Sequence, residues 1–222
     1  MQVDEAIRSR KSVRSFLPTP VPQSVVRHIL ELAARAPSGN NVQAWRVHVV
    51  TGNALRVLGE AMRAEARDHT QSCIPEYSYY PDQWVEPYLS RRRQCGYSLY
   101  EVLGIDRQDM AGRQRQMLRN FTFFDAPVGI MVTTDRRLNT GSFMDLGMFL
   151  QNIMLAARGQ GLHTCPQAAF ADLHHIVRQH LELGDEEILA CGVSLGFEDE
   201  GARENALQMP REPVDAFARF YR

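Results

Sequence analysis

The sequence contains few cysteines, and they are widely spaced. Its four cysteines are Cys73, Cys95, Cys165 and Cys191, with no close pairing and no Cys-x-x-Cys motif with nearby histidines. This spacing argues against a disulfide framework and against a structural zinc site. The other histidines, His174-His175 included, also lack ligand spacing with acids or cysteines, so no metal is expected. Such cysteine usage is typical of a protein in the reducing cytoplasm.

The sequence also lacks an excess of either charge and any long hydrophobic run. It has 25 lysines and arginines against 26 acidic residues, a formal net charge of −1. This balance provides no overall field for binding nucleic acid or an anionic membrane. No run of about 18 apolar residues occurs, and the polar start MQVDEAIRSRKSVRSF lacks the apolar segment of a signal peptide. We therefore expect a soluble protein that neither spans a membrane nor is secreted.

The 222 residues are 44% hydrophobic, enough for one sizeable core, and we expect a single domain over 1–222. Apolar spacing predicts helices over 3–8, 25–33, 53–69, 141–158, 173–180 and 214–221, with Ser24 as a helix cap. Strands are predicted over 45–50, 127–133, 163–167 and 188–197, and 127–133 is apolar enough for a central strand. Helices interleaved with a few buried strands favour an α+β fold, a mixed β-sheet flanked by helices.

A segment of about 71–124 interrupts this pattern. It holds four tyrosines between Tyr77 and Tyr88, together with Trp84, three prolines and the run Arg91-Arg92-Arg93, without clean periodicity. We interpret it as a cap inserted over the core. The arginine run is typical of a solvated surface, although it can also attract an anionic substrate or the phosphate of a nicotinamide nucleotide.

Two stretches carry cations that suit a phosphate. Arg10, Lys11, Ser12 and Arg14 bring positive charge and a hydroxyl together, and the planar guanidinium group suits a phosphate. A solvated helix end is the alternative for this string. Arg211, near the C-terminus, is a possible second phosphate cation.

Two further stretches suit a flat ring. The loop from Ala36 to Trp45 offers several amides, which can both donate to and accept from the edge of a heteroaromatic ring. An ordinary turn explains the same composition. The stretch from Gly159 to Ala169 is rich in small residues, which let backbone N–H groups approach a flat ligand.

Together these four stretches resemble the flavin nitroreductase family in order, spacing and chain length, over essentially the whole chain. The resemblance implies that Arg10, Lys11, Ser12 and Arg14 bind the phosphate of FMN and that Arg211 closes over it. It implies that the isoalloxazine ring lies against Pro166, Gln167, Ala168 and Ala169, with the backbone N–H of Ala168 near N5. It also implies a loop that reaches the flavin of a second subunit, made of Pro37, Ser38, Gly39, Asn41 and Gln43.

The sequence departs from the family pattern in two positions. Many members have an acidic residue where Ala168 stands and a lysine where Met209 stands. The missing acidic side chain does not affect a contact made by the backbone of Ala168. The missing lysine at Met209, in contrast, leaves Arg10, Arg14 and Arg211 to hold the phosphate. An amide or cation beside the pyrimidine ring is expected at Asn120 or Arg119.

The family resemblance implies an FMN-dependent oxidoreductase. Hydride passes from NADH or NADPH through N5 of the flavin to a small electron-poor acceptor, such as a nitroaromatic or a quinone, with ping-pong kinetics. The flavin carries this chemistry, so no catalytic side chain is needed, and none of the usual catalytic triads is apparent. The shared loop implies a homodimer with two interfacial sites, in which the helix over 141–158 lies at the interface.

The acceptor is expected to meet an aromatic cover. We predict that Phe123 or Phe124, with the tyrosine-rich cap, binds it, since aromatic side chains stack on flat molecules. The alternative is that these phenylalanines pack the cap onto the core. Other functions also stay open: dehalogenation, flavin fragmentation or dehydrogenation of a metabolite within the family, or a non-catalytic module that binds an anion.

Overall fold

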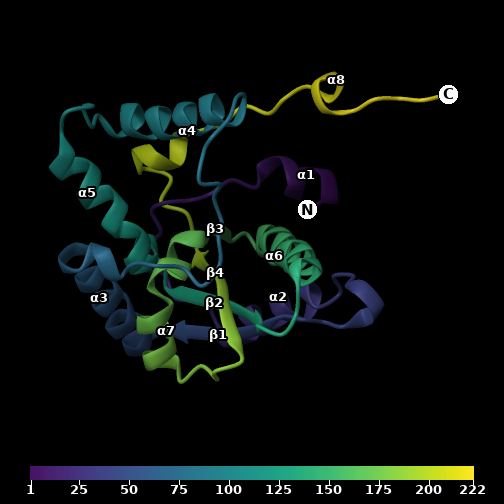
Figure 1. Ribbon diagram of the computed structural model, residues 1–222, viewed down its shortest axis with the longest axis horizontal. Helices are drawn as coiled ribbons and strands as arrows, with labels where there is room; N and C mark the ends of the chain where they lie inside the picture. Colours follow the sequence, from purple (N-terminus) through teal and green to yellow (C-terminus); the bar gives the residue numbers. More distant parts are fainter.

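The computed structural model describes residues 1–222, apart from the side chain of Thr70. One sheet lies at the centre, with helices on both of its faces (Figure 1). Its strands, in the order β1-β2-β4-β3, are β1 (Arg46–Thr51), β2 (Val128–Asp135), β4 (Glu187–Gly196) and β3 (His163–Gln167). The helices are α1 (Val3–Ser9), α2 (Gln23–Ala33), α3 (Gly52–Asp68), α4 (Tyr88–Leu103), α5 (Met110–Leu118), α6 (Thr140–Gly159), α7 (His174–Leu181) and α8 (Val214–Phe217).

Two hydrophobic clusters hold the helices to the sheet. On one face, Val26 and Ile29 of α2 and Phe149 and Ile153 of α6 pack against the central strands. On the other face, α3 and α7 pack with two 3-10 segments, η3 (Arg119–Asp125) and η4 (Ala168–Leu173). Strand β2 is buried at every position except Asp135, which explains its nearly unbroken apolar sequence.

The predicted α+β fold with a helix-flanked sheet is confirmed, but the sheet is less mixed than expected. All three strand pairings are antiparallel. Within the described part of the chain, parallel pairing is limited to an isolated bridge between Ser12 and Thr164. An unbroken apolar strand suggests a parallel sheet, because helices usually cover both faces of parallel sheets. In this protein, helices cover both faces of an antiparallel sheet.

The cap segment contains two helices that the sequence pattern did not predict. Helix α4 has no buried residue, so it carries no apolar stripe. Helix α5 follows Asp109, whose side chain accepts a hydrogen bond from the backbone N–H of Gly112 at 2.8 Å. Two smaller expectations also need correction: Pro22 rather than Ser24 precedes the first turn of α2, and the C-terminal helix covers only Val214–Phe217.

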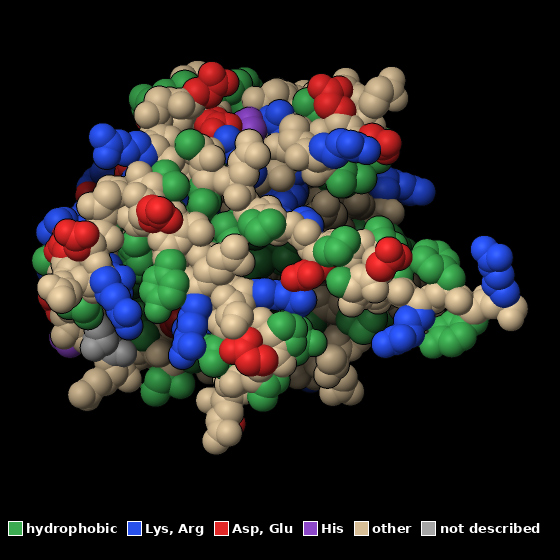
Figure 2. Space-filling model, turned by 90° about the horizontal axis from the view of Figure 1, so that it is seen from above, with side chains coloured by type: hydrophobic (Ala, Val, Ile, Leu, Met, Phe, Trp, Pro, Cys, Tyr) green, Lys and Arg blue, Asp and Glu red, His purple; other side chains and the backbone are tan. Residues whose placement is uncertain are grey.

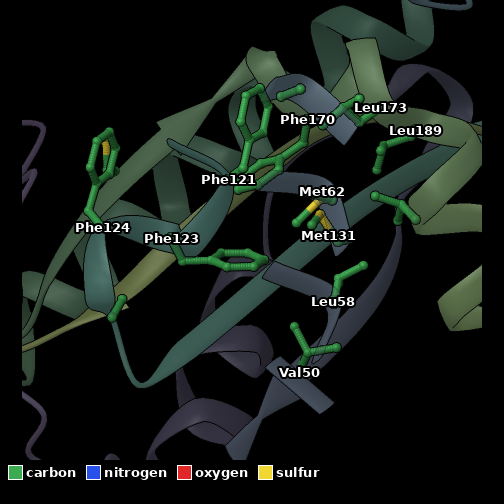
Figure 3. Packing of buried hydrophobic residues seen from close by; sticks show 14 of the residues in the cluster. Val50, Leu58, Met62, Phe121, Phe123, Phe124, Met131, Phe170, Leu173 and Leu189 are labelled. Atoms are coloured by element: carbon green, nitrogen blue, oxygen red, sulfur yellow. The ribbon is translucent and has the colours of Figure 1, made fainter. Parts of the chain in front are cut away.

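Phe123 and Phe124 do not form an open cover. They are 0% and 1% exposed and belong to the core, so their prediction as acceptor-binding residues is wrong for this structure. Figure 3 shows Phe123 and Phe170 approaching Met131 of β2. Glycines in the strands make room for these rings, because a Cβ at Gly129 would collide with Phe123 and one at Gly192 with Phe170. The phenylalanines thus pack the end of the cap onto the sheet.

The C-terminal segment extends away from the rest of the molecule beyond α4 (Figure 1). Its apolar side chains are largely exposed: Val214 by 53%, Phe217 by 71%, Phe220 by 79% and Tyr221 by 88%. None of the helices described here combines the length and the apolar character needed to cross a membrane.

Candidate binding site at the end of β3

Two adjoining cavities open beside β3. The smaller, of about 460 Å³, lies between the end of β3 and the cap residues Pro75 to Tyr80. The larger, of about 1380 Å³, is lined by the basic string 8–14, by α6 and by residues 207–212. Arg14 and Pro166 line both cavities, so the two form one elongated site. In the space-filling view the surface is hollowed near its middle, with basic side chains at the edge of the hollow (Figure 2).

The basic string is held in position by β3. The backbone N–H of Val13 donates to the carbonyl of Thr164 at 3.1 Å, and the Val13 side chain is fully buried. The backbone N–H of Arg14 donates to Asn205 Oδ1 at 2.7 Å, and Asn205 Nδ2 donates to the carbonyl of Ser15 at 2.8 Å. Asn205 is 2% exposed and fastens the segment that leads to Arg211 onto the string. We did not predict this role, because a single asparagine in a loop gives no distinctive signal.

Arg10 is the clearest candidate for anion binding in the site. In the described part of the chain its guanidinium group has no carboxylate partner. Burial lowers the pKa of Arg10, and the nearby positive charge of Arg211 lowers it further. Two cations are therefore held close together beside a cavity, an arrangement that an anion stabilises.

Lys11 has a different environment from the one predicted. Its ammonium group forms an ion pair with Glu198 at 2.6 Å and donates to the carbonyl of Asn205 at 2.7 Å. Glu198 also lies 3.3 Å from His163 Nε2, which is 2.7 Å from Arg158 Nη1. Because its charge is already neutralised, Lys11 anchors the string rather than offering a free cation.

The smaller cavity contains all four residues predicted to line the ring, Pro166, Gln167, Ala168 and Ala169. The side chain of Gln167 turns away from it, since Nε2 donates to the carbonyl of Asn120 at 2.8 Å and Oε1 accepts from Ser194. Gln167 thus helps to hold Asn120, which does line the cavity. Arg119 instead pairs with Glu204 and Asp125.

The cysteine of this cavity is not reactive. Burial raises the pKa of Cys165 to about 11, so the thiol is protonated at neutral pH. Along β3 the cavity therefore offers backbone groups and small side chains, without an activated nucleophile, while Arg14 and Asp172 are the charged residues of its lining. This composition suits a flat ring that itself carries the chemistry.

The loop from Pro37 to Gln43 lines neither cavity of its own chain. Its backbone is held by local contacts: the Gln43 N–H donates to Ser38 Oγ at 2.9 Å, and the Gly39 N–H donates to Asp145 of α6 at 3.3 Å. Asn40, Asn41 and Gln43 have positive φ angles. The loop therefore has a defined conformation next to α6, and it lies outside the site that the same chain forms.

The fold and this site define an α+β protein with a site that suits an elongated ligand with an anionic end and a flat end. The family model described as "Nitroreductase family" matches residues 7–197. The chain belongs to the nitroreductase family.

Two relatives and one solved structure are similar over nearly the whole chain. A chloronitrobenzene nitroreductase of Comamonas testosteroni is 42% identical, covering 98% of this chain and 96% of that protein. A 4-nitrobenzoate reductase of Pseudomonas putida is 39% identical, covering 98% and 94%. The FMN- and NADPH-dependent nitroreductase NfnB of Sphigopyxis sp. strain HMH is 38% identical with a TM-score of 0.96, covering 100% of this chain and 99% of that chain.

Proposed function

We propose that this protein is a nitroreductase that uses FMN and NADPH to reduce nitroaromatic compounds. The observation that carries the proposal is the elongated site, with unpaired cations at one end and the flat, small-residue surface of β3 at the other. These features match the two ends of FMN, and the relatives named above are nitroreductases. The buried, protonated thiol of Cys165 beside the ring-binding surface agrees with chemistry carried by a cofactor.

The residues of the site bind and orient the cofactor. Arg10, Arg211 and the hydroxyl of Ser12 hold the phosphate, while Arg14 lies where the two cavities meet. Ala168 and Ala169 leave the ring accessible along β3, and Asn120 offers an amide to its edge. Bound FMN supplies hydride transfer from NADPH to the acceptor. The backbone N–H of Ala168 is the group that we assign to N5.

The acceptor site lies between β3 and the cap. Tyr79 and Tyr80 line the smaller cavity and pack edge to face, with ring centroids 4.7 Å apart. These tyrosines, rather than Phe123 or Phe124, are the aromatic side chains available to stack on a flat acceptor. We therefore keep the tyrosines of the cap as acceptor-binding residues and no longer assign this role to the two phenylalanines.

We also propose that the protein is a homodimer with shared sites. Met144 and Met148 lie one turn apart on α6 and are 70% and 38% exposed, which leaves an apolar face without a partner. The exposed apolar C-terminal segment and the loop 37–43, which lines no cavity of its own chain, suit contacts with a second copy. Four unpaired cysteines support a reducing location such as the cytoplasm.

Cofactor rebinding tests the first part of the proposal. The purified protein is expected to be yellow, and the protein stripped of flavin is expected to bind FMN at least tenfold more tightly than riboflavin. This difference follows because charge-assisted hydrogen bonds to the phosphate contribute roughly 1.5–3 kcal/mol each. Equal affinity for the two flavins would contradict the assignment of the cationic end to the phosphate.

A further inference from the structure

The smaller cavity contains one carboxylate that nothing described so far uses. Asp172 belongs to η4 and lines the cavity together with Ala169, Ala171 and the cap tyrosines. It does not line the larger cavity, so it lies on the side away from the phosphate-binding cations.

Asp172 differs from the other partly buried carboxylates of the chain. Glu76 pairs with Arg136 at 2.9 Å, Glu187 lies 2.9 Å from His48, and Glu204 pairs with Arg119. Among the side chains that the structure describes, none donates a hydrogen bond to Asp172 and none forms an ion pair with it. Burial raises the pKa of Asp172, in agreement with a carboxyl group that lacks a compensating cation. A half-buried carboxylate without an internal partner faces whatever enters the cavity.

The other charged groups near the cavity do not form an ion pair with Asp172 among the described side chains. Arg14 is the one cation among the lining residues, and it lies at the junction with the larger cavity. Arg92 is held over the ring of Trp84, 5.0 Å from its centroid, and does not line the cavity. Asp172 lies close enough to the cap to affect Tyr80: burial is the main cause that raises the pKa of Tyr80, Tyr79 and Asp172 raise it further, and the charge of Arg92 lowers it.

We propose that Asp172 determines the acceptor class by disfavouring nitroaromatic compounds that carry a carboxylate, so that neutral nitroarenes are the preferred substrates. The inference rests on the proposed nitroreductase function. The family likeness does not decide this point, because the two curated relatives are named for a neutral nitroarene and for a nitrobenzoate. The physical basis is repulsion between two like charges brought close together beside a half-buried carboxylate.

The test compares 4-nitrobenzoate with 4-nitrobenzamide, an uncharged analogue of nearly the same shape. The measured quantity is the ratio of their kcat/KM values, anaerobically and with NADPH, in the FMN-loaded enzyme. We expect the parent to favour the benzamide by about tenfold or more, a difference of the order expected for one close like-charge contact. In Asp172→Asn the ratio is expected to fall to near one, whatever happens to the absolute rates.

Asp82→Asn is the matched control. It removes the same charge from an exposed cap position outside the cavity and is expected to leave the ratio unchanged. The inference is overturned if the parent does not discriminate against 4-nitrobenzoate, if Asp172→Asn keeps the parent ratio, or if Asp82→Asn alters it equally. Failure to reduce either compound would instead overturn the nitroreductase proposal, and this inference with it.

Discussion

At the scale of single residues, Arg10 is the most informative cation. It lies beside Arg211 and has no carboxylate partner in the structure as described. We expect Arg10→Ala to weaken FMN binding by about one to two orders of magnitude, since one charge-assisted hydrogen bond contributes roughly 1.5–3 kcal/mol. Titration of the flavin-free protein measures this change. Arg27→Ala, at an exposed position of α2, is the control, and equal affinities in both variants would show that Arg10 is only a solvated side chain.

Phe124 provides a second test at this scale, because it was expected to meet the acceptor and instead lies in the core. It is 1% exposed, and Phe124→Ala is expected to lower the free energy of unfolding by about 3–5 kcal/mol. Denaturant unfolding measures this loss, with Tyr97→Ala at a 49% exposed position as the control. A variant of unchanged stability but altered preference among acceptors would restore Phe124 to the acceptor site.

His163 makes the stability depend on pH in a defined window. Burial and the charge of Arg158 lower its pKa to about 4, so the folded protein keeps the ring neutral. Arg158 donates to Nε2, which suits the neutral form. Between the unfolded pKa near 6.5 and the folded value, the unfolded chain binds more protons, so this group reduces stability as the pH falls.

The corresponding measurement is the melting temperature as a function of pH. We expect His163→Gln to lose less stability than the parent between pH of about 6.5 and 4, since the variant has no ring to protonate. His28→Gln, at an exposed position of α2, is expected to follow the parent. Parallel curves for the parent and His163→Gln would contradict the buried neutral state.

At the scale of elements, the sequence predicted the helices and strands whose buried faces produce a regular spacing of apolar residues. The bounds of β3 were predicted at 163–167 as observed, and α6 and β2 were predicted to within two residues. These elements bury a regular pattern of side chains, which leaves a direct trace in the sequence. Helix α4 leaves no such trace, since none of its residues is buried; its signal is the left-handed Gly104 that ends it.

The turn at the end of the cap shows what could not be predicted. Phe123, Phe124 and Asp125 all have φ between 53° and 67°, a left-handed conformation that is costly outside glycine. This turn directs both rings into the core, where the ring of Phe123 lies against Gly129 of β2 and Phe170 of η4. The conformation depends on contacts distant in sequence, so local preferences gave no indication of it. The basic string and the β3 residues were predictable because their positions follow from a short, continuous motif.

Helix α6 carries the prediction for assembly. Met144→Lys with Met148→Lys adds two charges to its exposed apolar face, and we expect the proposed dimer to dissociate and to lose FMN in part. Sedimentation and flavin content measure both effects. Met110→Lys, at a 69% exposed position on α5, is the control. A double variant that stays dimeric, or a monomer that still holds FMN tightly, would contradict the shared-site arrangement.

At the scale of the whole molecule, the two adjoining cavities suit the proposed use of two substrates in turn. The basic string and β3 are hydrogen bonded to each other, so the proposed cofactor site is built directly onto the sheet. The cap beside it presents tyrosines that can contact either the nicotinamide ring or the acceptor. One open face shared by the two substrates requires them to alternate, which predicts ping-pong kinetics.

The most direct test of this account follows the two half-reactions separately, without oxygen, in the FMN-loaded protein. NADPH is expected to remove the flavin absorbance with one equivalent per FMN, and nitrobenzene added afterwards is expected to restore it. Steady-state rates at several NADPH concentrations should then give parallel double-reciprocal lines. A flavin that NADPH does not reduce, or a reduced flavin that nitrobenzene does not reoxidise, would contradict the assignment as a nitroreductase.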